Sequence, residues 1–264
     1  MAITTIDGYV ASIKQRLVYN KSNSRATVQN TWFSIIDQAG NPGAGVLAGT
    51  STTAGVVPTD ATAGYPVISA FSGANTGYIG RISYSSTVAC RIALFDRVFL
   101  AGAYAFNANT ALTAQPSYAA RLPSTDYKGL EIWCEQVTAA TGIQGVNVTY
   151  TNESGVASRT TGITGTAAAQ TIGRLWQLPL QSGDSGVQLI SNVTGSTASV
   201  GTFNVMVLRP LGEFRVNIAN LGDIQDLLRT GLPQVYADSA LYVMVNADSV
   251  SSGLPELTID VVNG

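Results

Sequence analysis

The chain has 264 residues, enough for one large domain or two modest ones. Only 11% of them are Asp, Glu, Lys or Arg, less than half of the ~25% typical of globular domains, and the formal net charge is −2. The arginines are scattered singly and the lysines are few (Lys14, Lys21, Lys128), so the sequence offers no basic stripe for a nucleic-acid backbone and we expect no nucleic-acid partner.

The first predicted element is an amphipathic helix near the N-terminus. Its apolar stripe falls at helical spacing and consists of Ile6, Tyr9, Val10, Ile13 and Leu17. Thr4 or Thr5 can cap the helix, and Asp7 lies in the first turn, where the helix dipole favours a carboxylate. A helix of this kind either packs on its own domain or docks on a neighbouring protein, and both alternatives stay open at this point.

Export and membrane insertion are not expected from the sequence. Residues 1–19 contain no continuous apolar run of the kind that a secretory signal requires. The most apolar later segment, residues 88–106, is interrupted by Arg91, Asp96 and Arg97, so it does not reach the ~20 apolar residues of a spanning helix. We therefore expect no membrane partner.

The next part of the chain predicts strands separated by a long loop. Residues 28–36 include Trp32 and Phe33 and favour a strand, whereas residues 38–45 are rich in Gly and Pro. From there to about Pro66 the chain is small and polar, which indicates a long surface loop. Strands are predicted again at residues 77–83 and 89–100, with a helical turn at 118–121.

The middle of the chain predicts short strands at regular spacing. Residues 129–137, with Trp133, form the clearest strand, and residues 146–151 and 157–163 flank a turn at residues 152–155. Asn147 and Asn152 begin N-glycosylation sequons, but without an export signal we interpret this stretch as a hairpin. Further strands are predicted at residues 172–180, 187–193 and 200–208, the pattern of a sandwich or jelly roll.

The C-terminal part predicts a short helix at residues 221–228, capped by Asp223, followed by strands at 241–246 and 256–262. The sequence as a whole predicts a mainly-β protein: a β-sandwich or jelly-roll core with a short N-terminal helix and a small C-terminal β element. We expect three segments. They are 1–122 (the helix, a β region and the long surface loop), 123–210 (the β-sandwich region) and 211–264 (the short helix and two strands). The motif Tyr78-Ile79-Gly80-Arg81 returns as Thr171-Ile172-Gly173-Arg174, a weak hint of two related β halves.

Catalytic motifs are missing from the sequence. There is no histidine, which removes Ser-His-Asp and Cys-His catalysis, and no Gly-Lys-Ser/Thr phosphate loop occurs. Cys90 and Cys134 lie inside apolar runs and are interpreted as buried thiols. We expect no catalytic residue, no metal ligand and no cofactor, and hence a protein that is not an enzyme.

Two pairs of carboxylates were the strongest candidates for an enzyme site. Glu131 and Glu135 share one face of a predicted strand and are interpreted as a solvated face. Asp223 and Asp226 are about one helical turn apart and are interpreted as a cap with an exposed neighbour. Glycoside hydrolysis needs two carboxylates facing each other across a cleft, which neither pair supplies. Asp184, in a Gly-rich stretch, is interpreted as a turn residue rather than a calcium ligand.

Four short stretches of the first 210 residues form a recognisable series: residues 6–11 (IDGYVA), 31–34 (TWFS), 40–45 (GNPGAG) and 78–81 (YIGR). In this order they resemble a group of tailed-phage virion proteins. The group opens with a short helix, a Trp-containing strand and a Gly-x-Pro-Gly-x-Gly loop, and its later β region resembles residues 129–208. The likeness covers about residues 5–210, and none of its motifs is chemical.

The resemblance implies a structural protein of the phage head, a decoration or cement protein on the capsid surface of the virion. It implies the major capsid protein as partner, together with self-contacts or homo-oligomers on the particle, and assembly in the host cytoplasm. A charge-poor, hydroxyl-rich surface is typical of a chain packed against other protein. The helix stripe from Ile6 to Leu17 is the predicted contact surface.

Three alternatives stay open. The first is a tail or portal-proximal component, including a carbohydrate- or receptor-binding β module with exposed aromatic residues such as Tyr104, Tyr118 or Trp176. The second is a carboxylate enzyme in which the fold brings distant acidic residues together. The third, suggested by composition alone, is an extracellular β module.

Overall fold

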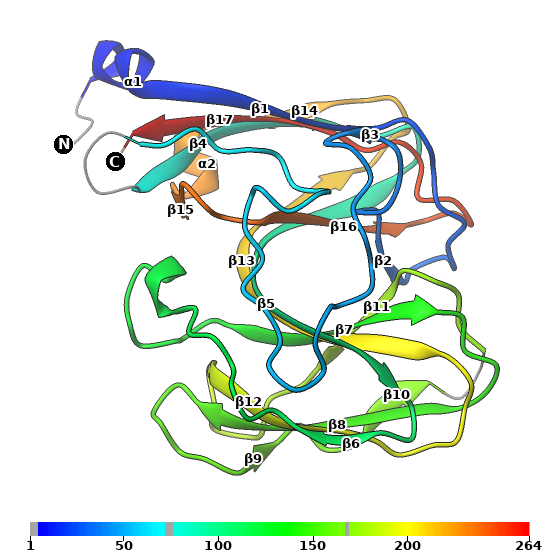
Figure 1. The fold of residues 1–264 in the computed structure, drawn as a ribbon. Coiled ribbons are helices and arrows are strands. Elements are labelled where there is room, and N and C mark those ends of the chain that lie inside the picture. The colour runs from blue at the N-terminus through cyan, green and yellow to red at the C-terminus, as the bar shows by residue number, and fades with distance from the viewer. Residues whose placement is uncertain (1–4, 72–75, 167–168, 264) are drawn as a thin grey trace.

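The computed structural model describes residues 5–71, 76–166 and 169–263. The chain builds three layers, a closed six-stranded barrel with one β-sheet on either side of it (Figure 1). We call the sheet that contains both terminal strands the upper sheet and the other the lower sheet. All of the strand pairings are antiparallel, as expected of a chain made of short strands and turns.

The upper sheet joins the beginning and the end of the chain. Its strands, in spatial order, are β14 (Asp223–Gln225), β4 (Thr76–Ser85), β17 (Glu256–Asn263), β1 (Ile13–Lys21) and β3 (Gly40–Asn41), with β15 (Gln234–Tyr236) also paired to β4. β17 lies between β1 and β4, so the last strand of the chain is hydrogen-bonded to the first. The helix α1 (Ile6–Ser12) precedes β1, and α2 (Leu227–Thr230) contacts β4.

The barrel is closed by strands from all parts of the sequence. In order they are β11 (Arg174–Leu178), β2 (Trp32–Ser34), β16 (Leu241–Ala247), β5 (Cys90–Ala105), β13 (Thr202–Val216) and β7 (Glu131–Thr138). β5 and β13 are the longest strands and pair along their whole length. Each of them packs one half against the upper sheet and the other half against the lower sheet, and so ties the three layers together.

The lower sheet is formed by the middle of the chain. Its strands are β10 (Thr164–Thr166), β8 (Gln144–Asn152), β12 (Val187–Gly195) and β6 (Asn109–Ala111), with β9 (Arg159–Thr160) also paired to β8. A 3-10 turn, η1 (Ala119–Arg121), follows β6.

Apolar side chains gather in three cores that match the three layers. The first lies between the upper sheet and the barrel and includes Ile82, Phe214 and Ile259. The second lies between the barrel and the lower sheet and includes Phe203 and Tyr150. The third fills the barrel interior around residues such as Phe95, Trp133 and Met244. Both cysteines are free and buried, as predicted.

The predicted fold class is confirmed: the chain is mainly β, with a short N-terminal helix, a barrel and sandwich-like sheets. The last two strands are also found where predicted, but β16 is one of the six strands of the barrel and β17 is a central strand of the upper sheet. The division into residues 1–122, 123–210 and 211–264 stays a prediction. β13 continues without interruption through Leu211.

Two predicted helices differ from the observed elements. The N-terminal helix ends at Ser12, and Ile13 and Leu17 belong to strand β1. The segment 221–228 is mostly extended: Asp223 lies on β14, and the short α2 is capped by Asp226, whose carboxylate accepts from the backbone N–H groups of Leu228 and Arg229. In both places, pairing with β17 or β4 outweighs the local helical pattern.

The predicted hairpin at residues 146–163 is confirmed. β8 pairs with β9, and the turn is organised by the Asn152 side chain, whose Oδ1 accepts hydrogen bonds from the backbone N–H groups of Ser154 and Val156. Gly155 has φ +80°, the left-handed conformation that such a turn requires. Thus Asn152 serves the turn in the way that makes Asn common there.

Asp184, predicted to be a turn residue, fastens this hairpin to the loop before β12. Its carboxylate accepts from Tyr150 Oη at 2.6 Å, Asn152 Nδ2 at 2.8 Å and Arg159 Nε at 2.9 Å. The hydrogen bond from Arg159, followed by those from Tyr150 and Asn152, lowers the pKa of Asp184 to about 2. The carboxylate is therefore fully engaged by protein donors.

We expect Asp184→Asn to destabilise the protein by about 1–3 kcal/mol at neutral pH, because it removes charge-assisted hydrogen bonds. A carboxyl group whose pKa is depressed in the folded state contributes stability above its unfolded pKa of ~3.9 and loses it as the pH falls towards 2. Urea unfolding at several pH values should therefore show the variant and the wild type converging between about pH 4 and pH 2. Asp7→Asn, at an exposed site, is the control; a constant difference across that range would contradict the assignment.

Candidate functional site

The N-terminal helix lies on the outside of the upper sheet. Thr5 caps it, because its Oγ1 accepts a hydrogen bond from the backbone N–H of Gly8 at 3.0 Å. The helix then leads directly into β1 at Ile13. None of the residues of α1 is buried, so the helix contributes little to the core.

The structure divides the five predicted contact residues into three groups. Ile6 and Val10 are exposed, with 81% and 61% of their surfaces accessible. Tyr9 and Ile13 are half-buried, and Leu17 is buried in the upper core. The role of the stripe as a contact surface stays a prediction, and only Ile6 and Val10 are free to meet a partner.

Tyr9 anchors the helix to the sheet. Its ring lies over Gly80, where a Cβ atom would be 2.8 Å from the tyrosine Cε2. Gly80 is also the extra residue in a β-bulge, because Arg81 and Ile79 pair with consecutive residues of β17. Burial, and then the charge of Asp260, raise the pKa of Tyr9. The glycine of the first Ile-Gly-Arg motif therefore makes room for a helix.

The second copy of this motif makes room for a different side chain. Gly173, just before β11, has φ +79°, and a Cβ atom there would be 2.6 Å from the guanidinium carbon of Arg25. Arg25 in turn donates hydrogen bonds to the Ser34 carbonyl and to Asp37. The two motifs lie in different layers, the upper sheet and the barrel, and share only the need for close approach.

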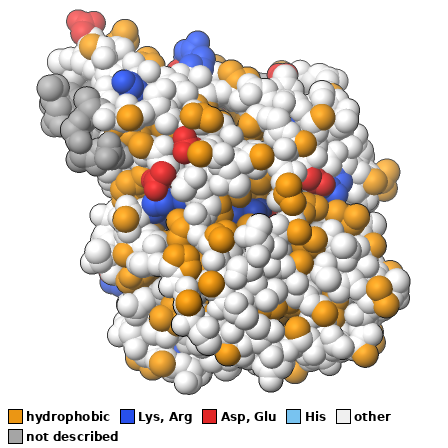
Figure 2. Space-filling view, viewed as in Figure 1, with side chains coloured by type: hydrophobic (Ala, Val, Ile, Leu, Met, Phe, Trp, Pro, Cys, Tyr) orange, Lys and Arg blue, Asp and Glu red, His pale blue; other side chains and the backbone are white. Residues whose placement is uncertain are grey.

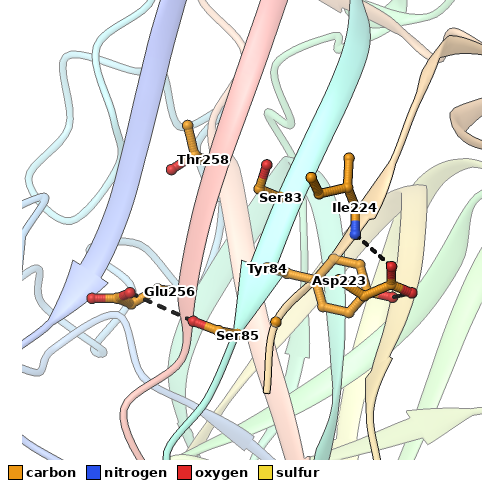
Figure 3. Close-up of a pocket in the computed structure, with 8 residues that line it drawn as sticks. Ser83, Tyr84, Ser85, Asp223, Ile224, Glu256 and Thr258 are labelled. Atoms are coloured by element: carbon orange, nitrogen blue, oxygen red, sulfur yellow. Dashed lines mark hydrogen bonds between the residues drawn. The ribbon is translucent and has the colours of Figure 1, made fainter. Parts of the chain in front are cut away.

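A shallow groove crosses the outer face of the upper sheet beside β14 (Figure 3). Its volume is about 440 Å³, and it is lined by Ser83, Tyr84, Ser85, Gly222, Asp223, Ile224, Glu256 and Thr258. Glu256 accepts hydrogen bonds from Asn20 at 2.7 Å and, more weakly, from Ser85 at 3.5 Å. Asp223 accepts one from Tyr84 Oη at 3.3 Å. Figure 3 shows the two carboxylates on opposite sides of β4.

This groove is lined mainly by polar side chains. Its hydroxyl groups belong to Ser83, Ser85 and Thr258 and are aligned on adjacent strands of one face. Burial, and then the charge of Asp223, raise the pKa of Tyr84, so its phenol stays protonated as a donor at neutral pH. Within residues 5–71, 76–166 and 169–263, no group of three or more His, Cys, Asp or Glu side chains could hold a metal ion. No helix in the same ranges is long and apolar enough to cross a membrane.

The interpretation of Glu131 and Glu135 as a solvated face is wrong. Glu135 is completely buried in the barrel and accepts hydrogen bonds from Tyr242 Oη at 2.7 Å and Asn204 Nδ2 at 3.0 Å. Glu131 is half-buried and accepts from Trp133 Nε1 at 2.7 Å. Burial raises the pKa of Glu131, while the hydrogen bond from Trp133 lowers it in part. Both faces of β7 are buried: Ile132 and Cys134 pack in the core shared with the lower sheet, and Trp133 and Glu135 are buried on the opposite face.

A second buried carboxylate, Asp96, forms the centre of this interior network. It accepts hydrogen bonds from Arg121, from Arg209 Nη2 at 3.0 Å and from Ser239 Oγ at 2.9 Å. The next residue, Arg97, contacts both oxygens of Glu135 at 3.4 Å. Arg121 and Arg209 therefore pair with Asp96, and Arg97 pairs with Glu135, with all five side chains at most 9% exposed. We did not predict this network, since Asp96 and Arg97 looked like interruptions of an apolar segment.

The aromatic residues proposed for a sugar-binding groove are not on the surface. Tyr104 and Tyr118 are both 1% exposed, and Trp176 is 9% exposed. Tyr104 packs against Phe203 in the lower core, and Tyr118 Oη donates to the carbonyl of Val187 at 2.8 Å. These three side chains stabilise the fold and offer no platform for a ligand.

The surface carries few charges and many single apolar side chains. On the face seen in Figure 2, most of the surface is uncharged and apolar side chains are spread across it. The most exposed large apolar residues are Leu228, Ile6, Val250, Val46, Ile163 and Val200. Leu228 belongs to α2, which lies at the same end of the upper sheet as α1 (Figure 1). We call Ile6, Val10 and Leu228 the helix surface.

Comparison with known proteins adds no family to this description. No protein-family model matches the chain, and no curated protein matches it. Among solved structures, the chain is similar to the stem and receptor binding domain of the spike protein P1 from bacteriophage PM2. The sequence identity is 8%, the alignment covers 95% of this chain and 98% of that chain, and the TM-score is 0.13. It is also similar to the structure of infectious bursal virus derived T=1 particles, with 8% identity, 96% and 76% covered, and a TM-score of 0.12. Both are viral proteins, but TM-scores this low carry no argument about the present chain.

Proposed function

We propose that this chain is a non-enzymatic structural protein of a tailed-phage virion, which binds the capsid shell as a decoration or cement protein. The observation that carries the proposal is the helix surface. A helix with Ile6 and Val10 exposed is held on the outside of the upper sheet by Tyr9 and contributes nothing buried to its own fold. An apolar helix face that a domain does not use for itself is suited to a partner.

The composition of the rest of the surface is typical of a chain that is bound to other protein subunits. Charged residues make up 11% of the sequence, and charge is the usual protection against association. The groove beside β14 adds hydroxyl groups and two carboxylates to the same outer face. Apolar contacts of the helix surface and polar contacts of the groove together give the apolar centre and polar rim of a protein interface. The proposed partner is the major capsid protein.

Replacing Ile6 and Val10 together with Asp should abolish particle binding while the protein stays folded. Burial of an aliphatic side chain contributes about 1.5–3 kcal/mol, so the loss of two should weaken binding at least about a hundredfold. Sedimentation with particles that lack the chain measures the binding, and circular dichroism checks the fold. The variant Ile143→Asp/Val200→Asp removes two equally exposed apolar residues near the lower sheet and is the matched control. If the two double variants bound the particles with the same affinity, the result would contradict a role for the helix in binding.

Stoichiometry in purified virions separates a shell protein from a tail protein. Quantitative mass spectrometry gives the number of copies of this chain relative to the major shell subunit. A ratio near unity, or a simple fraction of it, supports the decoration or cement role. A trace amount would move the chain to the tail or portal, and complete absence from virions would overturn the proposal.

A further inference from the structure

A partly open apolar pocket lies between the barrel and the long loop that follows β3. Its volume is about 380 Å³, within the range of small-molecule sites. The side chains that line it include Ile36, Val46, Val56, Val57, Leu100 and, among the polar residues, Tyr65 and Arg97. We call it the barrel pocket. Its walls are branched aliphatic groups, which suit a flexible hydrocarbon chain.

The loop wall of the barrel pocket is held in place by hydrogen bonds to the barrel. Val56 and Leu100 exchange both backbone hydrogen bonds, at 2.8 and 2.9 Å. Asn204 Nδ2 donates to the carbonyl of Leu47 at 2.6 Å, and its Oδ1 accepts from the backbone N–H of Gly49 at 2.9 Å. The pocket is therefore formed before any ligand arrives, and a ligand would not have to order the loop.

Arg97 gives the barrel pocket a cation with spare hydrogen-bonding capacity. Its side chain is 1% exposed, and its guanidinium group stacks on the Tyr242 ring with 3.9 Å between the guanidinium carbon and the ring centroid. The two contacts with Glu135 are long, at 3.4 Å each. Its Nε–H has no hydrogen-bond acceptor among the described residues. A buried donor without an acceptor is unfavourable, and a ligand that supplies the acceptor removes this penalty.

The ion pairs beside the barrel pocket fall into two sets. Arg121 and Arg209 both pair with Asp96, whereas Arg97 at the pocket forms a 1:1 pair with Glu135. Tyr65, the other polar group near Arg97, supplies no anion: burial raises its pKa to about 12, although Arg97 lowers it in part. What Arg97 lacks is therefore an acceptor for its Nε–H, and a carboxylate is the strongest acceptor for a guanidinium group because the hydrogen bond is charge-assisted.

We propose that the barrel pocket binds a small aliphatic monocarboxylate, with the carboxylate at Arg97 and the hydrocarbon chain among Val46, Val56, Val57 and Leu100. The carboxylate would accept from the unpartnered Nε–H of Arg97, and the alkyl chain would bury apolar surface on both sides. The site is separate from the helix surface and from any partner of the upper sheet. The ligand would stabilise the barrel from within.

Isothermal titration calorimetry of the intact chain with octanoate, and with octan-1-ol as its uncharged counterpart, tests the proposal. We expect octanoate to bind at least about tenfold more tightly and to raise the melting temperature, because its carboxylate forms a charge-assisted hydrogen bond with Arg97, whereas a hydroxyl oxygen is a weaker, uncharged acceptor. Ala63→Trp, which fills the rim of the pocket, should abolish binding. Ala61→Trp, at an exposed neighbouring site outside the lining, should leave it unchanged.

Three results would overturn the inference. Equal affinity for octanoate and octanol would mean an apolar hollow with no role for Arg97. Binding that survives in Ala63→Trp would place the ligand elsewhere. No binding of octanoate or of shorter and longer carboxylates to the folded protein would mean that the pocket takes no such ligand. The variants change only the loop, so each outcome can be read without disturbing the buried network.

Discussion

Replacement of Asp96 by Asn should destabilise the protein by about 3–5 kcal/mol, as expected when one partner of a buried ion pair is removed. The carboxylate is completely buried and lies against the guanidinium groups of Arg121 and Arg209. An amide at the same position has no charge, and its NH₂ group would face donors. Arg121 and Arg209 would then remain buried without the carboxylate that pairs with both of them.

Urea unfolding followed by circular dichroism measures this effect. Asp238→Asn is the matched control, since Asp238 is exposed and lies one residue before Ser239 in the same turn. We expect the control to stay within about 0.5 kcal/mol of the wild type. If Asp96→Asn does not fold, Ser239→Ala removes a single donor to the same carboxylate and should cost about 1 kcal/mol. Full stability of both variants would show that the network does not contribute to folding.

The fold class was predictable because local patterns carry it. Short strands of alternating polarity, separated by Gly, Asn and Pro, indicate antiparallel β structure, and β7 and β8 lie where the alternation places them. The turn at Asn152 was predictable for the same reason. The closure of six strands into a barrel could not be predicted in this way. It requires β2 to pair with β11 and with β16, which both lie far from β2 in the sequence.

The end of α1 could not be located from the sequence because two periodicities overlap. Ile6, Tyr9, Val10, Ile13 and Leu17 fit one helical face. The pattern Leu17, Tyr19 and Lys21 fits one face of a strand equally well, and these three side chains are buried in the structure. Pairing with β17 decides in favour of the strand. Lys21 belongs to the buried face because its Nζ donates to the carbonyl of Pro42 at 2.7 Å.

The buried network escaped prediction for a related reason. Sequence patterns treat charged residues as exposed, and this is correct unless another charge compensates for them. Some partners of Asp96 and Glu135 lie more than a hundred residues away in the sequence. Arg209, which binds Asp96, and Tyr242, which binds Glu135, are examples. No local spacing marks such pairs. The short N-terminal helix was easier to predict, since its start depends on local spacing and capping, whereas its role as a contact surface stays a prediction.

Replacement of Phe203 by Ala should cost about 3–5 kcal/mol, the usual range for removing a buried aromatic side chain. Phe203 is completely buried in the lower core, with ring centroids 4.8 Å from Phe106 and 5.8 Å from Tyr104. Phe214, on the same strand β13, is buried in the upper core, 5.1 Å from Tyr84. The two phenylalanines therefore report on opposite sides of the barrel.

Because β5 and β13 run through both cores, we expect Phe203→Ala and Phe214→Ala to shift one common unfolding transition. Tryptophan fluorescence and far-ultraviolet circular dichroism should give the same midpoint in each variant. If residues 211–264 fold as a unit of their own, Phe214→Ala would instead lower one transition and leave a second in place. The comparison thus decides whether the three predicted segments are independent or whether the two long strands make the three layers a single cooperative unit.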